Sequence, residues 1–236
     1  MGKSLILVLA LAFPALASQP IPERAKTYLP ELVAVQRAHW PDAPQPHFLA
    51  GQIEQETCAS LTHSKCWNPR AELKTSRENG IGLAQHTRAY NADGSIRFDI
   101  IDDLARKHPE LRGWNWETRY NASYQLLGLV LMDKGIYDRI KGAASATDRL
   151  AFMLSAYNGG EGGLAQDRRL CANTKGCDPA RWKGHVETTS LKRKAPQPGY
   201  KKSFFEINRE YVRNVLDVRR AKYAPYFEKS YGSPGT

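Results

Sequence analysis

A chain of 236 residues is long enough for one substantial domain, or at most two small ones, with a hydrophobic core. Apolar residues make up 42% and charged residues 25%, values near the globular average that exclude disordered, collagen-like and solenoid compositions. The 34 basic and 24 acidic side chains give a net charge of +10, which favours a polyanionic partner such as nucleic acid, a membrane surface or a cell-wall polymer.

The N-terminal segment limits which of these partners are expected. A positive charge is followed by an almost wholly apolar run over residues 5–16, and an Ala-Leu-Ala site precedes Ser18. This layout is typical of a secretory signal peptide, and the run is short for a membrane-spanning helix. A buried helix is the alternative, but Pro14 and the alanine-rich end favour cleavage. We expect removal of residues 1–17 and a periplasmic or secreted protein, for which nucleic acid is not an expected partner.

The cysteines fit an exported protein. They fall into two close pairs, Cys58 with Cys66 and Cys171 with Cys177. Zinc sites usually have tighter spacing and histidine partners, so no metal is expected. Two local disulfides in an oxidising compartment are the favoured interpretation. Four cysteines allow three pairings, and the sequence alone leaves the choice among them open.

Apolar spacing predicts helices along most of the chain, after an N-terminal lead-in over 18–44. The expected helices are 26–39, 47–57, 100–107, 121–137, 148–159 with Ser145 or Thr147 as its N-cap, and 204–223. Polar stretches predict long loops over 58–80 and 159–202. Strand-like alternation is scarce and no repeat occurs, so we expect a mainly α single domain.

One carboxylate has a helical context suited to acid catalysis. Glu56 ends the expected helix 47–57, whose apolar face contains Phe48, Leu49 and Ile53. The negative end of the helix dipole and partial burial both raise the pKa of a carboxyl group. A raised pKa is what a general acid for glycoside cleavage needs. Most helix-terminal glutamates are solvated, so only the neighbouring sequence motifs make Glu56 a candidate catalytic acid.

Three short motifs follow one another in order, and a fourth lies near the C-terminus. They are Ile-Glu-Gln-Glu-Thr at 53–57, Ser-Arg-Glu-Asn-Gly-Ile-Gly-Leu-Ala-Gln at 76–85, Ser-Ala-Tyr-Asn-Gly-Gly-Glu-Gly at 155–162, and Tyr-Val-Arg-Asn-Val-Leu at 211–216. Together they resemble the lytic transglycosylases of the soluble (SLT) type, a branch of the lysozyme-like superfamily. Goose-type lysozymes are similar less closely. The resemblance covers most of the mature chain and implies a lysozyme-like domain over 45–236, with long loops around a glycan cleft.

The resemblance also implies the chemistry. Glu56 would protonate the bond between N-acetylmuramic acid and N-acetylglucosamine, and then take a proton from the C6 hydroxyl to close a 1,6-anhydro ring. The substrate's own acetamido group would stabilise the positive centre, so no cofactor is expected. The residues implied to bind the glycan strand are Thr57, Ser76, Gly82, Leu83, Gln85, Tyr157, Asn158 and Tyr211.

The chain departs from the family pattern at several positions. Thr57 replaces the usual serine but keeps a hydroxyl, Ala84 replaces a methionine, and Gly159 replaces an alanine. The glutamate that often precedes the last motif is displaced to Glu206, with Ile207 in its place. These departures fall around the implied glycan subsites and leave Glu56 in place.

Two alternatives remain open. A hydrolytic muramidase would use Glu56 together with Glu78, which precedes the glycine-rich turn of the second motif. The other alternative is a non-catalytic wall-binding protein of the same fold, which Glu56 and the Tyr-Asn pair disfavour. The basic runs at 192–194 and 201–202 are expected to form a solvated loop with weak attraction to an anionic wall or membrane, and the protein is expected to be a monomer.

Overall fold

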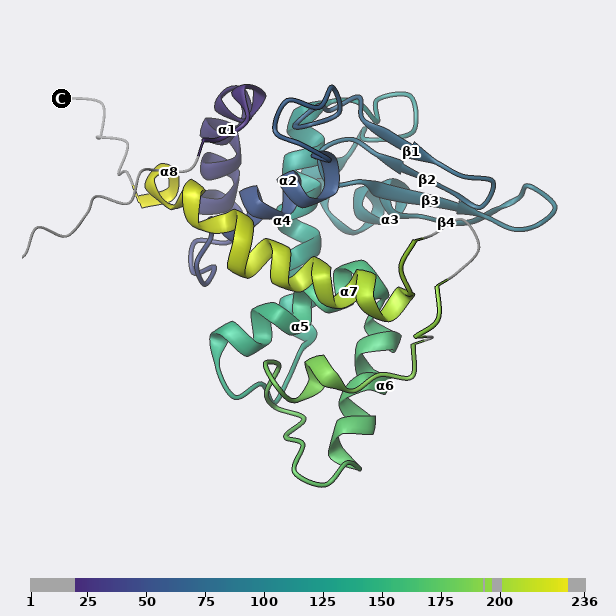
Figure 1. Ribbon diagram of the computed structural model, residues 1–236. Helices are drawn as coiled ribbons and strands as arrows, with labels where there is room; N and C mark the ends of the chain where they lie inside the picture. Colours follow the sequence, from purple (N-terminus) through teal and green to yellow (C-terminus); the bar gives the residue numbers. More distant parts are fainter. Residues whose placement is uncertain (1–19, 193, 197–200, 229–236) are drawn as a thin grey trace, which may run out of the picture.

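The computed structural model describes residues 20–192, 194–196 and 201–228, so the predicted signal peptide lies outside the described residues. The chain is mainly helical with one small sheet (Figure 1). Its helices are α1 (Glu23–His39), α2 (Phe48–Thr57), α3 (Ile100–Lys107), α4 (Ala122–Arg139), α5 (Ala146–Gly159), α6 (Glu161–Ala172), α7 (Phe204–Arg213) and α8 (Ala224–Glu228). Its strands are β1 (Glu72–Lys74), β2 (Glu78–Ile81), β3 (His86–Tyr90) and β4 (Ile96–Asp99). A π-helical turn (Asn214–Arg219) and a 3-10 turn (Arg220–Tyr223) follow α7.

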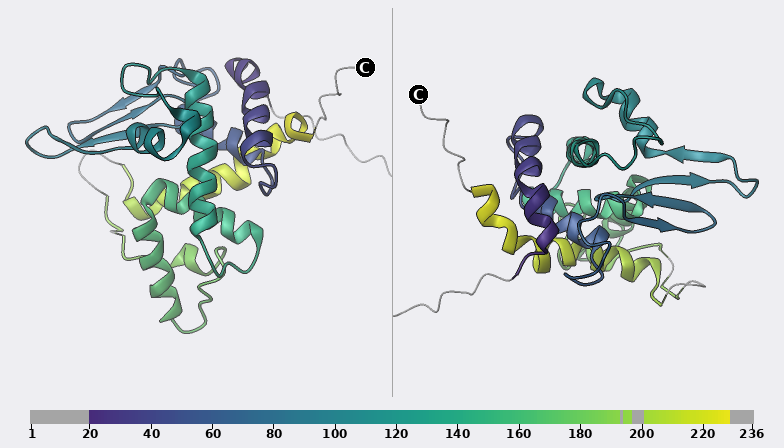
Figure 2. Two further views of the ribbon diagram at one scale, coloured as in Figure 1. Left: turned by 180° about the vertical axis from the view of Figure 1, so that it is seen from behind. Right: turned by 90° about the horizontal axis from the view of Figure 1, so that it is seen from above.

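The core lies among the helices. Helix α2 packs against the turns after α7, α4 contacts both α1 and α5, and α5 packs against α7. The apolar face predicted for α2 is confirmed, because Phe48, Leu49 and Ile53 are fully buried. Figures 1 and 2 show the sheet at one end of the molecule and α1 with α8 at the other. The larger of two apolar clusters contains the buried residues of α2 and holds this helix between these two ends.

Side-chain caps mark the start of α3, α4, α5 and α7. Ser145 accepts a hydrogen bond from the Asp148 amide at 3.0 Å and starts α5, as one of the two predicted caps. Asn121 accepts from the Tyr124 amide at the start of α4. A side-chain oxygen at this position binds a backbone N–H that has no partner within the helix. The predicted helices over 100–107 and 121–137 are confirmed to within two residues at either end.

The sheet corrects the loop predicted over 58–80. Four antiparallel strands lie in the order β1-β2-β3-β4, with Glu78 opposite Ala89 across β2 and β3. The strands have three to five residues, and β1 and β4 are largely exposed. Such short, half-solvated strands carry no run of alternating apolar residues, which is why the sequence pattern failed to predict them.

Helix α6 corrects the loop predicted over 159–202. Gly160 adopts a φ of +81° that ends α5 and redirects the chain into α6. Two glycines in the first turn of α6 lower its intrinsic helix propensity, so the segment resembled a loop. The final helix predicted over 204–223 is also less regular than expected, because a π-helical turn and a 3-10 turn replace its second half.

Both local disulfides are present, Cys58 with Cys66 and Cys171 with Cys177. Two disulfides fit an exported protein, as the cysteine spacing predicted. Among the described residues, no helix has the length and apolar character needed to cross a bilayer.

Candidate active site

A long groove runs along the junction of the sheet with the helical core. Its largest part has a volume of about 580 Å³ and adjoins a second part of about 360 Å³. The two parts share the side chains of Glu78, Gln85, Thr87, Tyr157 and Asn158. Glu56 lines the larger part beside this shared wall. The shared side chains make the two parts one continuous groove.

Glu56 is partly exposed to the groove and otherwise surrounded by protein. Its Oε1 atom accepts a hydrogen bond from the Tyr211 hydroxyl at 2.5 Å. Burial raises the pKa of Glu56 from 4.5 to about 7, while the Tyr211 hydrogen bond lowers it by a smaller amount. No salt bridge involves Glu56 within the described part of the chain. The carboxyl group therefore keeps its proton near neutral pH, as a general acid requires.

Two tyrosines form the wall behind the acid. The rings of Tyr157 and Tyr211 stack with centroids 6.2 Å apart and planes 12° from parallel. The Tyr157 hydroxyl donates to the Ala84 carbonyl oxygen at 2.5 Å. Tyr211 is 3% exposed and binds Glu56 directly, so it lies beneath the acid rather than open to a ligand. The aromatic wall lowers the local polarity and contributes to the burial that raises the pKa of Glu56.

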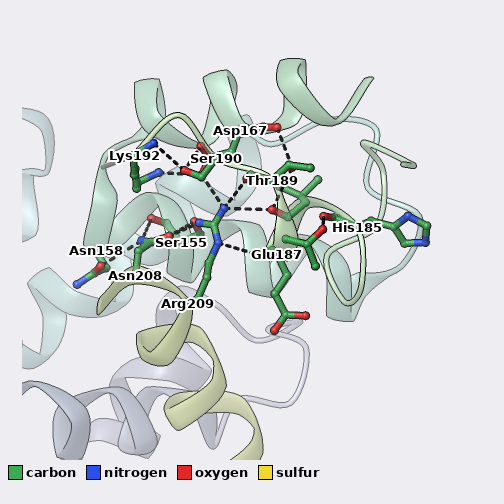
Figure 3. Close-up of polar contacts among 12 residues, drawn as sticks. Ser155, Asn158, Asp167, His185, Glu187, Thr189, Ser190, Lys192, Asn208 and Arg209 are labelled. Carbon is green, nitrogen blue, oxygen red and sulfur yellow. Dashed lines mark hydrogen bonds and ion pairs between the residues drawn. The ribbon is translucent and has the colours of Figure 1, made fainter. Parts of the chain in front are cut away.

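Asn158 is fixed by a polar network that links α5 to α7 (Figure 3). Asn208 Nδ2 donates to Asn158 Oδ1 at 3.1 Å and to the Ser155 carbonyl oxygen at 3.0 Å. Ser155 Oγ donates to Asn208 Oδ1 at 2.9 Å, and Arg209 Nη1 donates to the same oxygen at 2.5 Å. Because the Asn158 carbonyl faces this network, its amide nitrogen points away from it and remains available as a donor in the groove.

The same network is anchored on a buried ion cluster. Asp167 is 1% exposed and accepts from Arg209 Nη2 at 2.9 Å, Lys192 Nζ at 2.8 Å and Ser190 Oγ at 2.7 Å. Lys192 was expected to belong to a solvated basic loop, and this expectation is wrong, because its side chain is only 15% exposed and pairs with Asp167. Of the rest of that run, Arg193 lies outside the described residues and Lys194 is exposed, as expected.

Further predicted site residues also reach the groove. Gln85 and Glu78 line both of its parts, from the β2–β3 connection and from β2. Gln85 is a non-glycine residue at a φ of +47°, and its Nε2 atom donates to the Gly82 carbonyl oxygen at 2.8 Å. Thr57 lines the larger part, but its hydroxyl is already engaged, donating to the Ile53 carbonyl oxygen and accepting from the Trp67 amide.

The structure does not bring every predicted residue to the groove. Ser76 lies in the exposed turn between β1 and β2, outside the residues that line the groove. The Leu83 side chain is fully buried in the core. Gly82 has a φ of +73°, and a Cβ atom there would lie 2.2 Å from the Gln125 carboxamide, so this glycine serves a close approach. These three residues shape the second motif rather than present side chains to a ligand.

Only one of the two disulfides lies at the groove. Cys58 lines its larger part, directly after α2, and the Cys58–Cys66 bond closes the loop that follows Glu56. Cys171 and Cys177 join the end of α6 to the next turn and are not among the lining residues. Of the two bonds, the Cys58–Cys66 bond alone therefore borders the groove.

Sequence reasoning missed four polar residues that support the site. Gln52 and Asp133 lie fully buried behind Glu56. Asn208 binds Asn158 directly and is itself bound by Arg209. Gln52 stands four residues before Glu56 on α2, a spacing that places both on one helix face and could have drawn attention to it. The other three come from distant parts of the chain, and no local pattern marks them.

No group of side chains suited to hold a metal ion occurs in the described part of the chain. A scan of the sequence against known family models finds no match, and a search of curated proteins finds no relative. A functional assignment therefore depends on the four short motifs and on the geometry around Glu56.

Proposed function

We propose that this protein is an exported peptidoglycan lytic transglycosylase with a lysozyme-like fold. The observation that carries the proposal is Glu56, a carboxyl group that keeps its proton to about pH 7 in the wall of a long groove. The order of the four motifs and the two disulfides support the same conclusion. Peptidoglycan glycan strands are the proposed substrate, and the net charge of +10 suits their anionic surroundings.

Glu56 performs both proton transfers in the proposed mechanism. It first donates its proton to the glycosidic oxygen that leaves N-acetylmuramic acid, while the substrate's 2-acetamido group stabilises the positive charge at C1. The ionised Glu56 then accepts the proton of the C6 hydroxyl, whose oxygen closes the bond to C1. The products are a new chain end and a 1,6-anhydromuramoyl end, and no water is consumed.

The neighbouring side chains hold the substrate and the acid in place. Asn158 offers its amide nitrogen to a glycan carbonyl or hydroxyl oxygen, because Asn208 engages its other end. Tyr211 holds the Glu56 carboxyl by its hydroxyl, which limits the rotation of the acid. Gln85 also lines the groove, where its carboxamide can bind sugar hydroxyls.

A hydrolytic muramidase is the second candidate, and one observation favours it. Glu78 lines both parts of the groove that Glu56 borders, so a second carboxylate is available to a bound ligand. In a hydrolase of the inverting type, such a carboxylate activates the attacking water. A non-catalytic wall-binding protein would use the same groove without turnover.

Digestion of purified peptidoglycan separates the three candidates. The wild type and Glu56→Gln are incubated with the polymer, and the released muropeptides are identified by mass. Anhydromuramoyl ends from the wild type alone support the proposal. Reducing ends would support the muramidase instead, and release of nothing by the wild type would support the wall-binding protein. Glu31→Gln, a change on α1 outside the groove-lining residues, is the matched control.

A further inference from the structure

A second buried carboxyl group lies behind Glu56. Asp133, in the middle of α4, is 0% exposed and belongs to none of the four motifs. The titratable groups that face it are Glu56 of α2, Tyr157 of α5 and Tyr211 of α7. None of these is a cation, and no salt bridge to Asp133 occurs among the residues that the structure describes. The mechanism above assigns this group no part.

The hydrogen bonding of Asp133 is half complete. Gln52, which is also 0% exposed, donates from Nε2 to Asp133 Oδ1 at 3.4 Å. The other oxygen of each side chain, Gln52 Oε1 and Asp133 Oδ2, has no hydrogen-bond partner. An ionised carboxylate can only accept, and would leave both of these oxygens unsatisfied. A neutral carboxylic acid carries one O–H donor, which is complementary to the free carbonyl oxygen of a carboxamide.

The energetics favour the same protonation state. Burial of an ionised carboxylate without a cation is strongly unfavourable, so such a group takes up a proton instead. Burial raises the pKa of Asp133 well above its usual range; the Gln52 hydrogen bond lowers it by a smaller amount, and the charge of Glu56 raises it. Of the two carboxyl groups, Glu56 borders the groove and Asp133 does not. Ionisation near neutral pH is therefore expected at Glu56 first.

We propose that Asp133 is a positioning residue that acts as a neutral carboxylic acid, paired with the Gln52 carboxamide by two hydrogen bonds. The pair holds Gln52 beside the Tyr157 hydroxyl and keeps the layer behind Glu56 free of charge. Glu56 then ionises without a second negative charge behind it. The meaning of this pair for catalysis rests on the proposed function, whereas the protonation of Asp133 does not.

Infrared spectroscopy tests the protonation without substrate. The Glu56→Gln protein is compared with Glu56→Gln/Asp133→Asn, so that Glu56 contributes no carboxylic acid band. We expect the carbonyl band of a protonated, buried carboxylic acid that persists to at least about pH 8 and is lost in the double variant. Absence of the band, or its disappearance with a midpoint below about pH 6, would overturn the proposal.

The pH dependence of turnover tests the positioning role. Asp133→Leu removes the pairing and should lower kcat on the order of 10- to 100-fold, the effect of a displaced catalytic group. Asp133→Asn restores a neutral pair, so we expect it to recover most of this loss and to leave the basic limb of the kcat/KM profile in place. A basic limb that moves to lower pH in Asp133→Asn would show that the aspartate is ionised in the wild type and would overturn the proposal.

The two proposals fail separately. A persistent carboxylic acid band in a protein that releases nothing from peptidoglycan would reject the proposed enzyme and retain the neutral Asp133. Anhydromuramoyl products from a protein that lacks this band would retain the proposed enzyme and reject the neutral Asp133.

Discussion

Helix α2 carries two glutamates whose surroundings differ completely. Glu54 is 1% exposed, and its carboxylate accepts from Arg219 Nη1 at 2.8 Å and from Lys222 Nζ at 2.8 Å. Glu56 is bound by one uncharged hydroxyl, that of Tyr211, and borders the groove. Two residues along a helix turn the side chain by about 200°, so the two carboxyl groups point to opposite sides.

The two carboxyl groups have the same chemistry and differ in their environment. Two cations on the turns after α7 compensate the charge of Glu54, which makes this group part of the structure. Glu56 has no such partner, and burial raises its pKa to about 7. A carboxyl group that changes protonation near neutral pH is suited to proton transfer, whereas a paired one is suited to holding elements together.

The largest expected effect is on activity. Glu56→Gln removes the proton donor but keeps the shape of the side chain, so turnover of peptidoglycan should fall by about 10²- to 10⁴-fold. The loss of turbidity of a peptidoglycan suspension measures this, after circular dichroism has shown that the variant is folded. Full activity in Glu56→Gln would contradict the assignment of the acid.

The largest expected effect on stability lies on the other face of α2. Glu54→Gln leaves Arg219 and Lys222 without their carboxylate, and we expect a loss of about 3–5 kcal/mol in the free energy of unfolding. Urea denaturation at neutral pH measures it. Glu23→Gln is the matched control, because the Glu23–Lys26 pair is solvent-exposed and should change stability by less than about 1 kcal/mol. Equal stability of the wild type and Glu54→Gln would contradict the structural role of the Glu54 carboxylate.

In contrast to Glu54→Gln, Glu56→Gln should raise the stability of the fold, and only above acidic pH. The unfolded chain loses the Glu56 proton near pH 4.5, whereas the folded protein keeps it to about pH 7. The stability of the wild type therefore falls as the pH rises through this window and is level above it. Relative to the wild type, we expect Glu56→Gln to be about 3 kcal/mol more stable at about pH 8 and equally stable at about pH 4.

Urea denaturation at both pH values distinguishes this effect from a general one. A gain of the same size at both pH values would show that it does not arise from ionisation of Glu56.

Sequence patterns predicted most of the helices and missed α6 and the sheet, for physical reasons. The buried face of α2 and the Ser145 cap of α5 depend on neighbours along the chain, so local patterns reveal them. The cysteine spacing favoured the pairs that the structure contains. The strands have only three to five residues, β1 and β4 are largely exposed, and the register depends on partners across the sheet, which leaves little local signal.

The candidate site was predicted unevenly for the same reason. The second motif suggested Gln85, which lines the groove, but also Ser76 and Leu83, which do not. Asp133 looks like any polar residue of a helix until the fold encloses it. The partners of Asn158 come from α7, about 50 residues away along the chain, so only the folded structure brings them together.

The smallest expected effect concerns Glu78, another carboxylate that lines the groove. If the substrate supplies the acetamido group and the C6 hydroxyl, no water needs to be activated, and Glu78→Gln should reduce turnover by less than about threefold. The same turbidity assay measures it beside Glu56→Gln. A defect as deep as that of Glu56→Gln would favour the muramidase.

The protonation of Glu56 is the central claim and can be measured directly. A carbon-detected NMR titration of protein labelled at the glutamate carboxyl carbons follows each group, and the Glu56 signal is the one absent from Glu56→Gln. Uncompensated burial predicts a midpoint at about pH 7. A midpoint at or below the ordinary value of 4.5 would contradict the account, because Glu56 would then be ionised when it should donate its proton.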